Sequence, residues 1–417
     1  MRHLNHGSFG AVPLVAQERQ NQLRAEMERS PVVWFPELPR RVAAAREELA
    51  AFLRVDAGDL ALVPNASAGA STVYASLPRR RGGEIVVTDH GYGAVTMGAE
   101  RLARRWGGRV RTARVPLDAD EQQAYEAVAA ELAESTDLVV LDHITSATAR
   151  RMPVERIGAE ARRRGIPLLV DGAHSPGLIP APAGVECDFW IGNLHKWGCA
   201  PRGTAALVAR GPQRDRLRPL IDSWGAADPY PERFDQQGTV DLTSYLAAPS
   251  ALDFVEHTWG WQTARRYMDE LAGYAEQVVG AAFAELTGAA GTVDVGMPVP
   301  GMRLVRLPDG LASSRVEADG LRDRAARELG VETAFTSFGG VGYLRLSAHV
   351  YNTAADYEHF AERCVPVLGE WARAARSERS APQRCPAQRP GPEAAAGAPV
   401  LQDIQEPRGT RGKRSAR

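Results

Sequence analysis

The chain has 417 residues, 44% hydrophobic and 24% charged, which is ordinary for a globular protein and excludes a wholly disordered, collagen-like or disulfide-scaffold protein. Its 50 Lys and Arg residues balance 51 Asp and Glu residues, so a net charge of -1 gives no general attraction for nucleic acid. No apolar run approaches the ~18 residues of a membrane span, and no signal core follows Met1. Four cysteines without metal-like spacing favour no metal site and a cytoplasmic protein.

The first half of the chain alternates helical and strand-like segments. Apolar residues at intervals of three and four predict helices over 14–29 and 40–53, before the strand-like runs begin. Four short apolar runs then read as buried strands, at 85–88, 138–141, 166–170 and 204–208. Helical stretches lie between them, at 96–106, 120–134 and 153–164. This alternation predicts an α/β domain whose mostly parallel central sheet is flanked by helices, with ligands bound at the strands' carboxyl ends.

After residue 250 the pattern changes to that of a small α+β domain. The predicted elements are a helical stretch over 250–287, strands at 302–307 and 342–347, and helices at 314–329 and 354–367. From 374 onward the chain is rich in Arg, Pro, Ala, Ser and Gln and almost without apolar residues, which predicts disorder. The expected division is therefore a large domain over 1–248, a small domain over 249–373 and a tail over 374–417.

Three segments combine into one chemical hypothesis. Lys196 follows an apolar strand, and desolvation there would lower its pKa and make its amine a nucleophile. Asp171 ends another strand and is followed three residues later by His174, so a carboxylate and an imidazole could reach a flat ligand. Small residues after Val63, including Ser67 and Ala68, open a helix whose N-terminus could hold an anion. A lysine imine, an aspartate for a ring nitrogen and a phosphate cradle are what pyridoxal 5'-phosphate (PLP) requires.

The same order of motifs resembles the class V aminotransferase family of fold-type I PLP enzymes, and within it the isopenicillin N epimerase-like branch. The segments that carry this resemblance are Leu4–Gly10, Thr88–Ala94, Leu169–Gly177, Gly192–Trp197, Gly238–Thr239 and Leu344–Thr353. They span the chain apart from its tail. Each motif is weak alone, but together they are specific.

The resemblance implies roles for individual residues around the cofactor. Lys196 would hold PLP covalently and then act as the base at the substrate's Cα. Asp171 would keep the pyridine nitrogen protonated, and His174 would bond the ring's 3-oxygen. The phosphate would be held by Ser67, Ala68 and His195, with Thr239 added from the partner of a homodimer whose active sites lie at the interface.

Other implied roles concern the ring face and the substrate. Tyr92 is expected to stack on the ring or act as an acid–base group beside it, with His90 as the rival stacking residue. Arg345 would clamp the substrate's α-carboxylate. Asn5 and His6 are expected at the substrate pocket. Trp34 and Phe35 are also expected there, because they occupy a zone where epimerase-like relatives usually carry arginines.

The departures from the family pattern reduce the number of candidate reactions. Cysteine desulfurases of this family carry a loop cysteine that accepts the persulfide, and the corresponding stretch 333–343 of this chain contains no cysteine. Desulfurase activity is therefore not expected. The expected activity is C–S bond cleavage in a cysteine S-conjugate, in thiol or antibiotic metabolism, after a carbanion forms at Cα. An amino acid epimerase is the alternative, followed by a decarboxylating deaminase or an aminotransferase. A non-enzymatic regulator is disfavoured because Lys196, Asp171 and Arg345 are all present.

Overall fold

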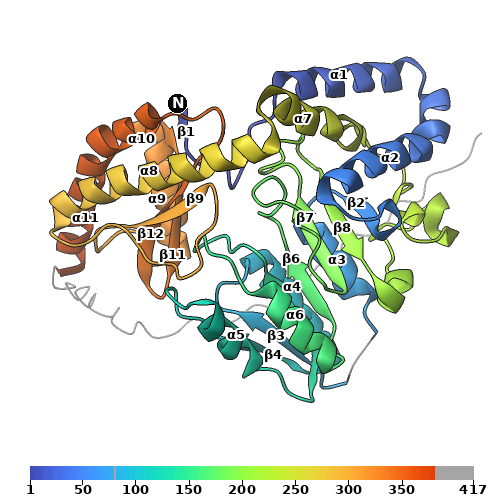
Figure 1. The fold of residues 1–417 in the computed structure, drawn as a ribbon, viewed down its shortest axis with the longest axis horizontal. Helices are drawn as coiled ribbons and strands as arrows, with labels where there is room; N and C mark the ends of the chain where they lie inside the picture. Colours follow the sequence, from blue (N-terminus) through green and yellow to red (C-terminus); the bar gives the residue numbers. More distant parts are fainter. Residues whose placement is uncertain (79–80, 381–417) are drawn as a thin grey trace, which may run out of the picture. The chain divides into compact units, whose positions relative to one another are not determined.

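The computed structural model describes residues 1–78 and 81–380, and residues 1–378 form one compact unit. A seven-stranded sheet has the strand order β2-β8-β7-β6-β5-β3-β4 (Figure 1). The strands are β2 (Leu60–Val63), β3 (Glu84–Thr88), β4 (Arg109–Ala113), β5 (Thr136–Asp142), β6 (Leu168–Asp171), β7 (Phe189–Asn193) and β8 (Ala205–Ala209). β8 pairs antiparallel with both β2 and β7, and all other pairs in this sheet are parallel. The predicted, mostly parallel sheet is confirmed.

Helices cover both faces of this sheet because its strands alternate their side chains between two apolar clusters. Val86 and Val139 pack with residues of α2, α5, α6 and α7, whereas Ile85 and Leu138 pack with α3 and α4 on the other face. The helices of this part of the chain are α1 (Leu14–Arg29), α2 (Pro31–Leu53), α3 (Ala66–Ser76), α4 (Gly93–Trp106), α5 (Glu121–Ala129), α6 (Val154–Arg163) and α7 (Thr243–Trp259).

Among the elements that differ from the predictions, two differ because a local sequence signal was misleading. α2 begins at Pro31 rather than at 40, and it contains Pro36 and Pro39, which normally discourage a helix. Pro31 at the first turn is compatible with a helix because its missing N–H has no partner there anyway. Strand β4 was not predicted, since it is a partly exposed edge strand of alternating Arg and small residues rather than an apolar run.

The second half of the chain builds a smaller antiparallel sheet with helices. Its order is β11-β12-β9. The elements are α8 (Trp261–Thr287), β9 (Met302–Arg306), α9 (Arg315–Leu329), β11 (Ala334–Phe338), β12 (Val341–Ser347), α10 (Ala354–His359), a π-helical turn (Phe360–Cys364) and α11 (Val365–Ser380). The helical stretch predicted over 250–287 is two helices, divided at Gly260, whose φ of 74° ends α7.

The N-terminus belongs to this second sheet region rather than to the large sheet. β1 (Arg2–His3) pairs in parallel with β10 (Val331–Glu332), and Leu4 lies in the apolar core of the C-terminal elements. α11 continues to Ser380, so the tail expected from 374 would begin inside a helix; residues 381–417 lie outside the described residues. In the described part of the chain, no helix combines the length and apolar character needed to cross a bilayer.

Candidate active site

The site lies where β5, β6 and β7 end. Asp142 ends β5 and is in register with Asp171, which ends β6; both carboxyl groups are buried. Lys196 follows β7, the next strand of the sheet. Because parallel strands end at one edge, three residues spread over 54 positions of sequence are brought together. Asp142 was missed by the sequence reasoning, although the same signal that selected Asp171, a carboxylate closing an apolar strand, was present.

Lys196 is half-buried, and its Nζ lies 3.0 Å from Nε2 of His174. Burial, together with the charge of Arg345, lowers the pKa of the Lys196 amine to about 8, although Asp171 and Asp142 act in the opposite direction. A substantial fraction of the amine is therefore neutral near physiological pH. A neutral lysine amine can act as a nucleophile toward a carbonyl group or as a base.

One of the two carboxylate oxygens of Asp171 has no hydrogen-bond partner among the described residues. Its Oδ1 accepts a hydrogen bond from the backbone N–H of Ala173 at 3.0 Å, whereas Oδ2 is buried without a partner among the described residues. Burial raises the pKa of the Asp171 carboxyl group, and that of Asp142 is raised well above its usual range by burial and by Asp171. A buried unpaired carboxylate oxygen is costly, so this geometry fits a ligand with a cationic N–H, such as a pyridinium.

The anion cradle predicted at residues 67 and 68 is only partly available. Asn65 caps α3 by accepting a hydrogen bond from the Ala68 N–H at 2.8 Å, so that this amide already has a partner. This corrects the expectation that Ala68 offers a free donor. Ser67 is half-buried in the first turn of α3, and Asn193 holds that turn against β7 by accepting from the Ala66 N–H. The helix N-terminus thus faces the Lys196 loop.

His195 presents one ring nitrogen to the same region. Its Nδ1 lies 3.0 Å from the carbonyl oxygen of Thr204, which can only accept, so Nδ1 carries the proton and Nε2 is the atom left for a ligand. Burial, followed by the charge of Lys196, lowers the pKa of His195 to about 4. His195 can donate to a phosphate only after it takes up a proton, which the negative charge of a phosphate would favour.

Arg345, on β12, is a buried cation surrounded by neutral acceptors. Its Nη1 donates to the carbonyl oxygen of Ser146 at 2.6 Å, and its Nη2 donates to Asn5 Oδ1 at 3.1 Å and to Ser8 Oγ at 2.7 Å. The Nε–H is buried without a partner among the described residues. Because none of these bonds neutralises the guanidinium, its charge remains available for a carboxylate. Asn5 therefore contacts the predicted site indirectly, by accepting a hydrogen bond from Arg345.

Tyr92, rather than His90, faces Lys196. The Tyr92 ring centroid is 5.9 Å from Lys196 Nζ, and the residue is 40% exposed, so that its ring is accessible. His90 is buried, with Nδ1 2.7 Å from Thr148 Oγ1 and Nε2 2.8 Å from the Val115 carbonyl oxygen. Its ring stacks on Phe338 at 4.3 Å. The geometry thus favours Tyr92 as the group beside the ring and gives His90 a structural role.

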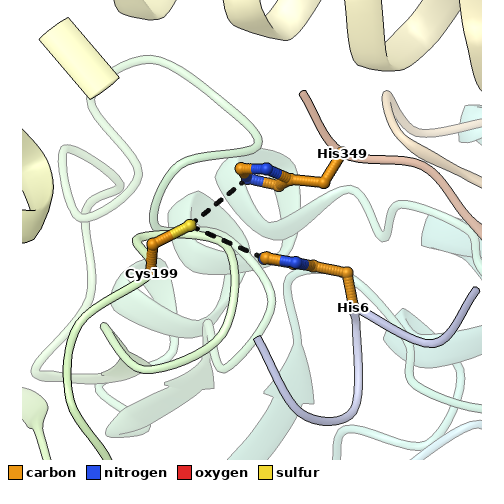
Figure 2. A group of neighbouring side chains, drawn as sticks. All are labelled: His6, Cys199 and His349. Atoms are coloured by element: carbon orange, nitrogen blue, oxygen red, sulfur yellow. Dashed lines mark hydrogen bonds between the residues drawn. The ribbon is translucent and has the colours of Figure 1, made fainter. Parts of the chain in front are cut away.

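His6 belongs to a buried cluster with Cys199 and His349, which the sequence reasoning did not foresee (Figure 2). Cys199 Sγ lies 3.9 Å from His6 Nε2 and 3.6 Å from His349 Nε2, and the two imidazoles stack at 3.9 Å. His6 Nε2 donates to the Lys196 carbonyl oxygen at 3.1 Å, and Nδ1 lies 3.0 Å from the Tyr351 hydroxyl. With this proton on Nε2, His6 offers no lone pair there to a metal.

This cluster therefore acts as a clasp between the N-terminal segment and the Lys196 loop. His6 is 0% exposed and both its nitrogens have protein partners, so the expectation that it contacts substrate is wrong. Trp34 also corrects an expectation: it is 2% exposed, packed in the apolar cluster on one face of the seven-stranded sheet and covered by the Arg41 guanidinium. Phe35 packs against the same core cluster. Trp34 and Phe35 therefore contribute to the core rather than to an open pocket.

Thr239 lies apart from these groups, on an exposed loop that follows a 3₁₀ turn at Glu232–Phe234. Gly238 before it has a φ of 88°, so this turn requires a residue that tolerates the left-handed region. Arg46 on α2 fixes the start of the loop by donating to both carboxylate oxygens of Asp235 at 2.7 Å. The predicted role of Thr239 in a partner subunit stays a prediction.

Comparison with known proteins places this site in context. A family model described as aminotransferase class V matches residues 14–290. The chain is 32% identical to the isopenicillin N epimerase of Amycolatopsis lactamdurans over 385 residues, which cover 86% of this chain and 93% of the epimerase. It is 24% identical over 376 residues to the hercynylcysteine sulfoxide lyase of Schizosaccharomyces pombe, covering 86% and 92% of the two chains. The solved cystine C–S lyase C-DES matches with a TM-score of 0.75 at 20% identity, over 88% of this chain and 97% of C-DES, which shows the shared fold.

Proposed function

Since this chain belongs to the class V aminotransferase family of PLP-dependent enzymes, we propose that it is a lyase that breaks the Cβ–S bond of a cysteine S-conjugate. The observation that carries the proposal is the pairing of one half-buried base, Lys196, with one buried cation that has only neutral partners, Arg345. The base suits removal of the Cα proton, and the cation suits retention of the α-carboxylate. Relatives with C–S lyase or L-cysteine desulfhydrase names support the same chemistry.

The residues present fit the cofactor. Lys196 would bind it covalently, the unpaired Oδ2 of Asp171 would meet the ring nitrogen, and Ser67 with His195 would meet the phosphate. Bound in this way, PLP supplies a sink for the electrons released at Cα. Tyr92 would lie along the ring, because its accessible ring faces the Lys196 amine.

Every bond broken in the proposed elimination is matched by a bond formed or by a leaving group. Arg345 holds the substrate carboxylate, so the Cα–H bond, rather than the Cα–carboxylate bond, is broken. The Lys196 amine takes the Cα proton, the electron pair of that bond forms the Cα–Cβ double bond, and the Cβ–S pair leaves with sulfur as a thiolate. The thiolate is then protonated. The released enamine tautomerises and reacts with water to give pyruvate and ammonia.

Epimerisation is the second candidate, because the chain is 32% identical to an isopenicillin N epimerase over most of both chains. An epimerase that uses two bases needs a proton donor on the face opposite Lys196. Tyr92, whose ring centroid lies 5.9 Å from Lys196 Nζ, is the residue that would have to supply this donor.

We further propose a cytoplasmic homodimer. The described residues include large apolar side chains that are strongly exposed in the single chain, among them Trp224 at 94% and Val32 at 86%. Burial of such side chains against a second copy would remove them from water. The exposed Thr239 loop is suited to reach a partner's phosphate site. The three cysteines of the described residues are free thiols, in keeping with a reducing compartment.

The test uses the purified holoenzyme with cysteine S-conjugates and L-amino acids in D₂O, read by mass spectrometry. Pyruvate with an equimolar thiol supports the lyase. Deuterium at Cα of an otherwise intact substrate, accompanied by the D-isomer, would replace the lyase with the epimerase. Lys196→Ala is expected to abolish either reaction. Lys413→Ala, which removes the only other lysine of the chain, is the matched control.

A further inference from the structure

Trp197 makes a hydrogen bond that the proposed reaction does not use. Its indole Nε1–H donates to His174 Nδ1 at 3.3 Å, inside the core, with Trp197 0% and His174 2% exposed. The other nitrogen of the same imidazole, Nε2, faces Lys196 Nζ at 3.0 Å. The histidine ring is thus held between an indole that can only donate and an amine that can either donate or accept, depending on its charge.

The donor on Nδ1 determines where the imidazole proton lies. An indole N–H has no lone pair to offer, so His174 Nδ1 must be the unprotonated nitrogen. A neutral imidazole has one N–H, and that proton must then be on Nε2, directed at Lys196. An imidazolium would turn an N–H toward the indole N–H, and burial with the charges of Lys196 and Arg345 opposes it as well. The amine can accept this proton's hydrogen bond only when it is neutral.

We propose that Trp197 is a positioning residue: its indole N–H fixes the His174 tautomer with the proton on Nε2 and thereby favours the neutral form of the Lys196 amine. The proposal concerns the lysine site of the proposed function. It specifies how one side chain outside direct contact with substrate prepares that site. The same Nε2–H would serve the ring oxygen of the bound cofactor.

Close packing around the Trp197 indole keeps it in the position where it donates to His174 Nδ1. A Cβ on Gly7 would lie 3.1 Å from Trp197 Cζ2, and one on Gly301 would lie 3.1 Å from Cζ3, so the backbone of both glycines packs closely on the ring. The His6 imidazole lies 5.2 Å away on the N-terminal segment. Trp197 also shares an apolar cluster with Leu178 and Met302. Residues from three separate parts of the chain therefore fix the donor.

The charged groups around Lys196 act on its amine in opposite directions, so the tautomer of His174 influences the protonation of that amine. Arg345 favours the neutral amine, whereas the carboxyl groups of Asp171 and Asp142 favour the ammonium. If the indole donor is removed, the His174 proton can move to Nδ1. Nε2 then becomes an acceptor, which stabilises an ammonium on Lys196. Loss of the donor is therefore expected to raise the Lys196 pKa, by about one unit for one hydrogen bond to a charged group.

The experiment measures this pKa in the full-length, cofactor-free chain. Competitive acetylation at a series of pH values, located by mass spectrometry, gives the pKa of Lys196, and Lys413 and the N-terminus are the other amines labelled. ¹⁵N solid-state NMR of histidine-labelled protein identifies the protonated nitrogen of His174, assigned by comparison with His174→Gln. The variants are Trp197→Phe and the replacement of Trp197 by β-(3-benzothienyl)alanine, which keeps the bicyclic shape and lacks the N–H.

Trp190→Phe is the matched control, because Trp190 is equally buried and its indole N–H has no partner among the described residues. We expect both position-197 variants to raise the Lys196 pKa and to protonate His174 Nδ1, with Trp190→Phe unchanged. Native-like values in the benzothienyl variant would overturn the proposal, even if Trp197→Phe failed to fold. Neither readout depends on turnover, so absence of lyase activity would refute the proposed function without affecting this result.

Discussion

Lys196→Met should stabilise the cofactor-free chain at neutral pH, and the gain should disappear as pH rises. The native Lys196 side chain is half-buried, and the pKa of its amine falls from 10.5 to about 8, chiefly because of desolvation and then because of Arg345. A fall of this size means that keeping the amine in the folded chain costs about 3 kcal/mol below pH 8, relative to its ordinary ionisation. Met removes the titrating group while keeping a similar length and an apolar surface.

The direction of the pH dependence follows from proton binding. Between pH 8 and pH 10.5 the unfolded chain retains the Lys196 proton and the folded chain has lost it, so native stability rises with pH in this window. The stability difference between Lys196→Met and native should therefore fall by about 2–3 kcal/mol from pH 7 to pH 10. In the native chain the amine accepts from His174 Nε2–H only once it is neutral, above about pH 8, so loss of this bond in the variant acts in the same direction as the expected fall.

The assay is urea unfolding of both cofactor-free proteins, followed by circular dichroism at each pH. Taking the difference between variant and native cancels groups that titrate equally in both. Lys413→Met, in which the other lysine of the chain is replaced, shows how much of the slope any lysine contributes. A stability difference that stays constant from pH 7 to pH 10 would refute the reasoning, because Lys196 would then titrate equally in the folded and unfolded chains.

Four further predictions test the rest of the site. Asp171→Asn should weaken cofactor binding at least about tenfold, measured by visible absorbance, because an amide cannot offset a positive ring nitrogen; undiminished binding would remove Asp171 from the cofactor site. Arg345→Gln should lower kcat/KM about 100-fold for carboxylate substrates, while equal losses with substrates that lack the carboxylate would argue against a clamp. His6→Ala should lower the free energy of unfolding by about 2 kcal/mol through two lost buried hydrogen bonds. Zn²⁺ should leave the Tm unchanged, and a rise in Tm that vanishes in Cys199→Ser would show that the clasp binds metal.

Local patterns were sufficient for the parts of the molecule that depend on neighbouring residues. Apolar periodicity predicted α1 at 14–29, and short apolar runs predicted the buried strands that end at Asp171 and precede Lys196. A parallel sheet collects its strand ends at one edge, so the fold class and the carboxylate–lysine grouping followed from the sequence. The family resemblance then pointed to His174 and Arg345, and the structure brings both of them to Lys196.

Only the tertiary structure decided which polar side chains are free to meet a ligand. His6, His90 and Ala68 lie in motifs that looked functional, yet partners distant in sequence or a helix cap already occupy their hydrogen-bonding atoms. Trp34 is one of the large core side chains, although its segment suggested a pocket. The reason is physical: local sequence determines the periodicity of a segment, but the burial and bonding of a side chain depend on residues that chain topology brings to it, such as Asn5 to Arg345 across 340 positions.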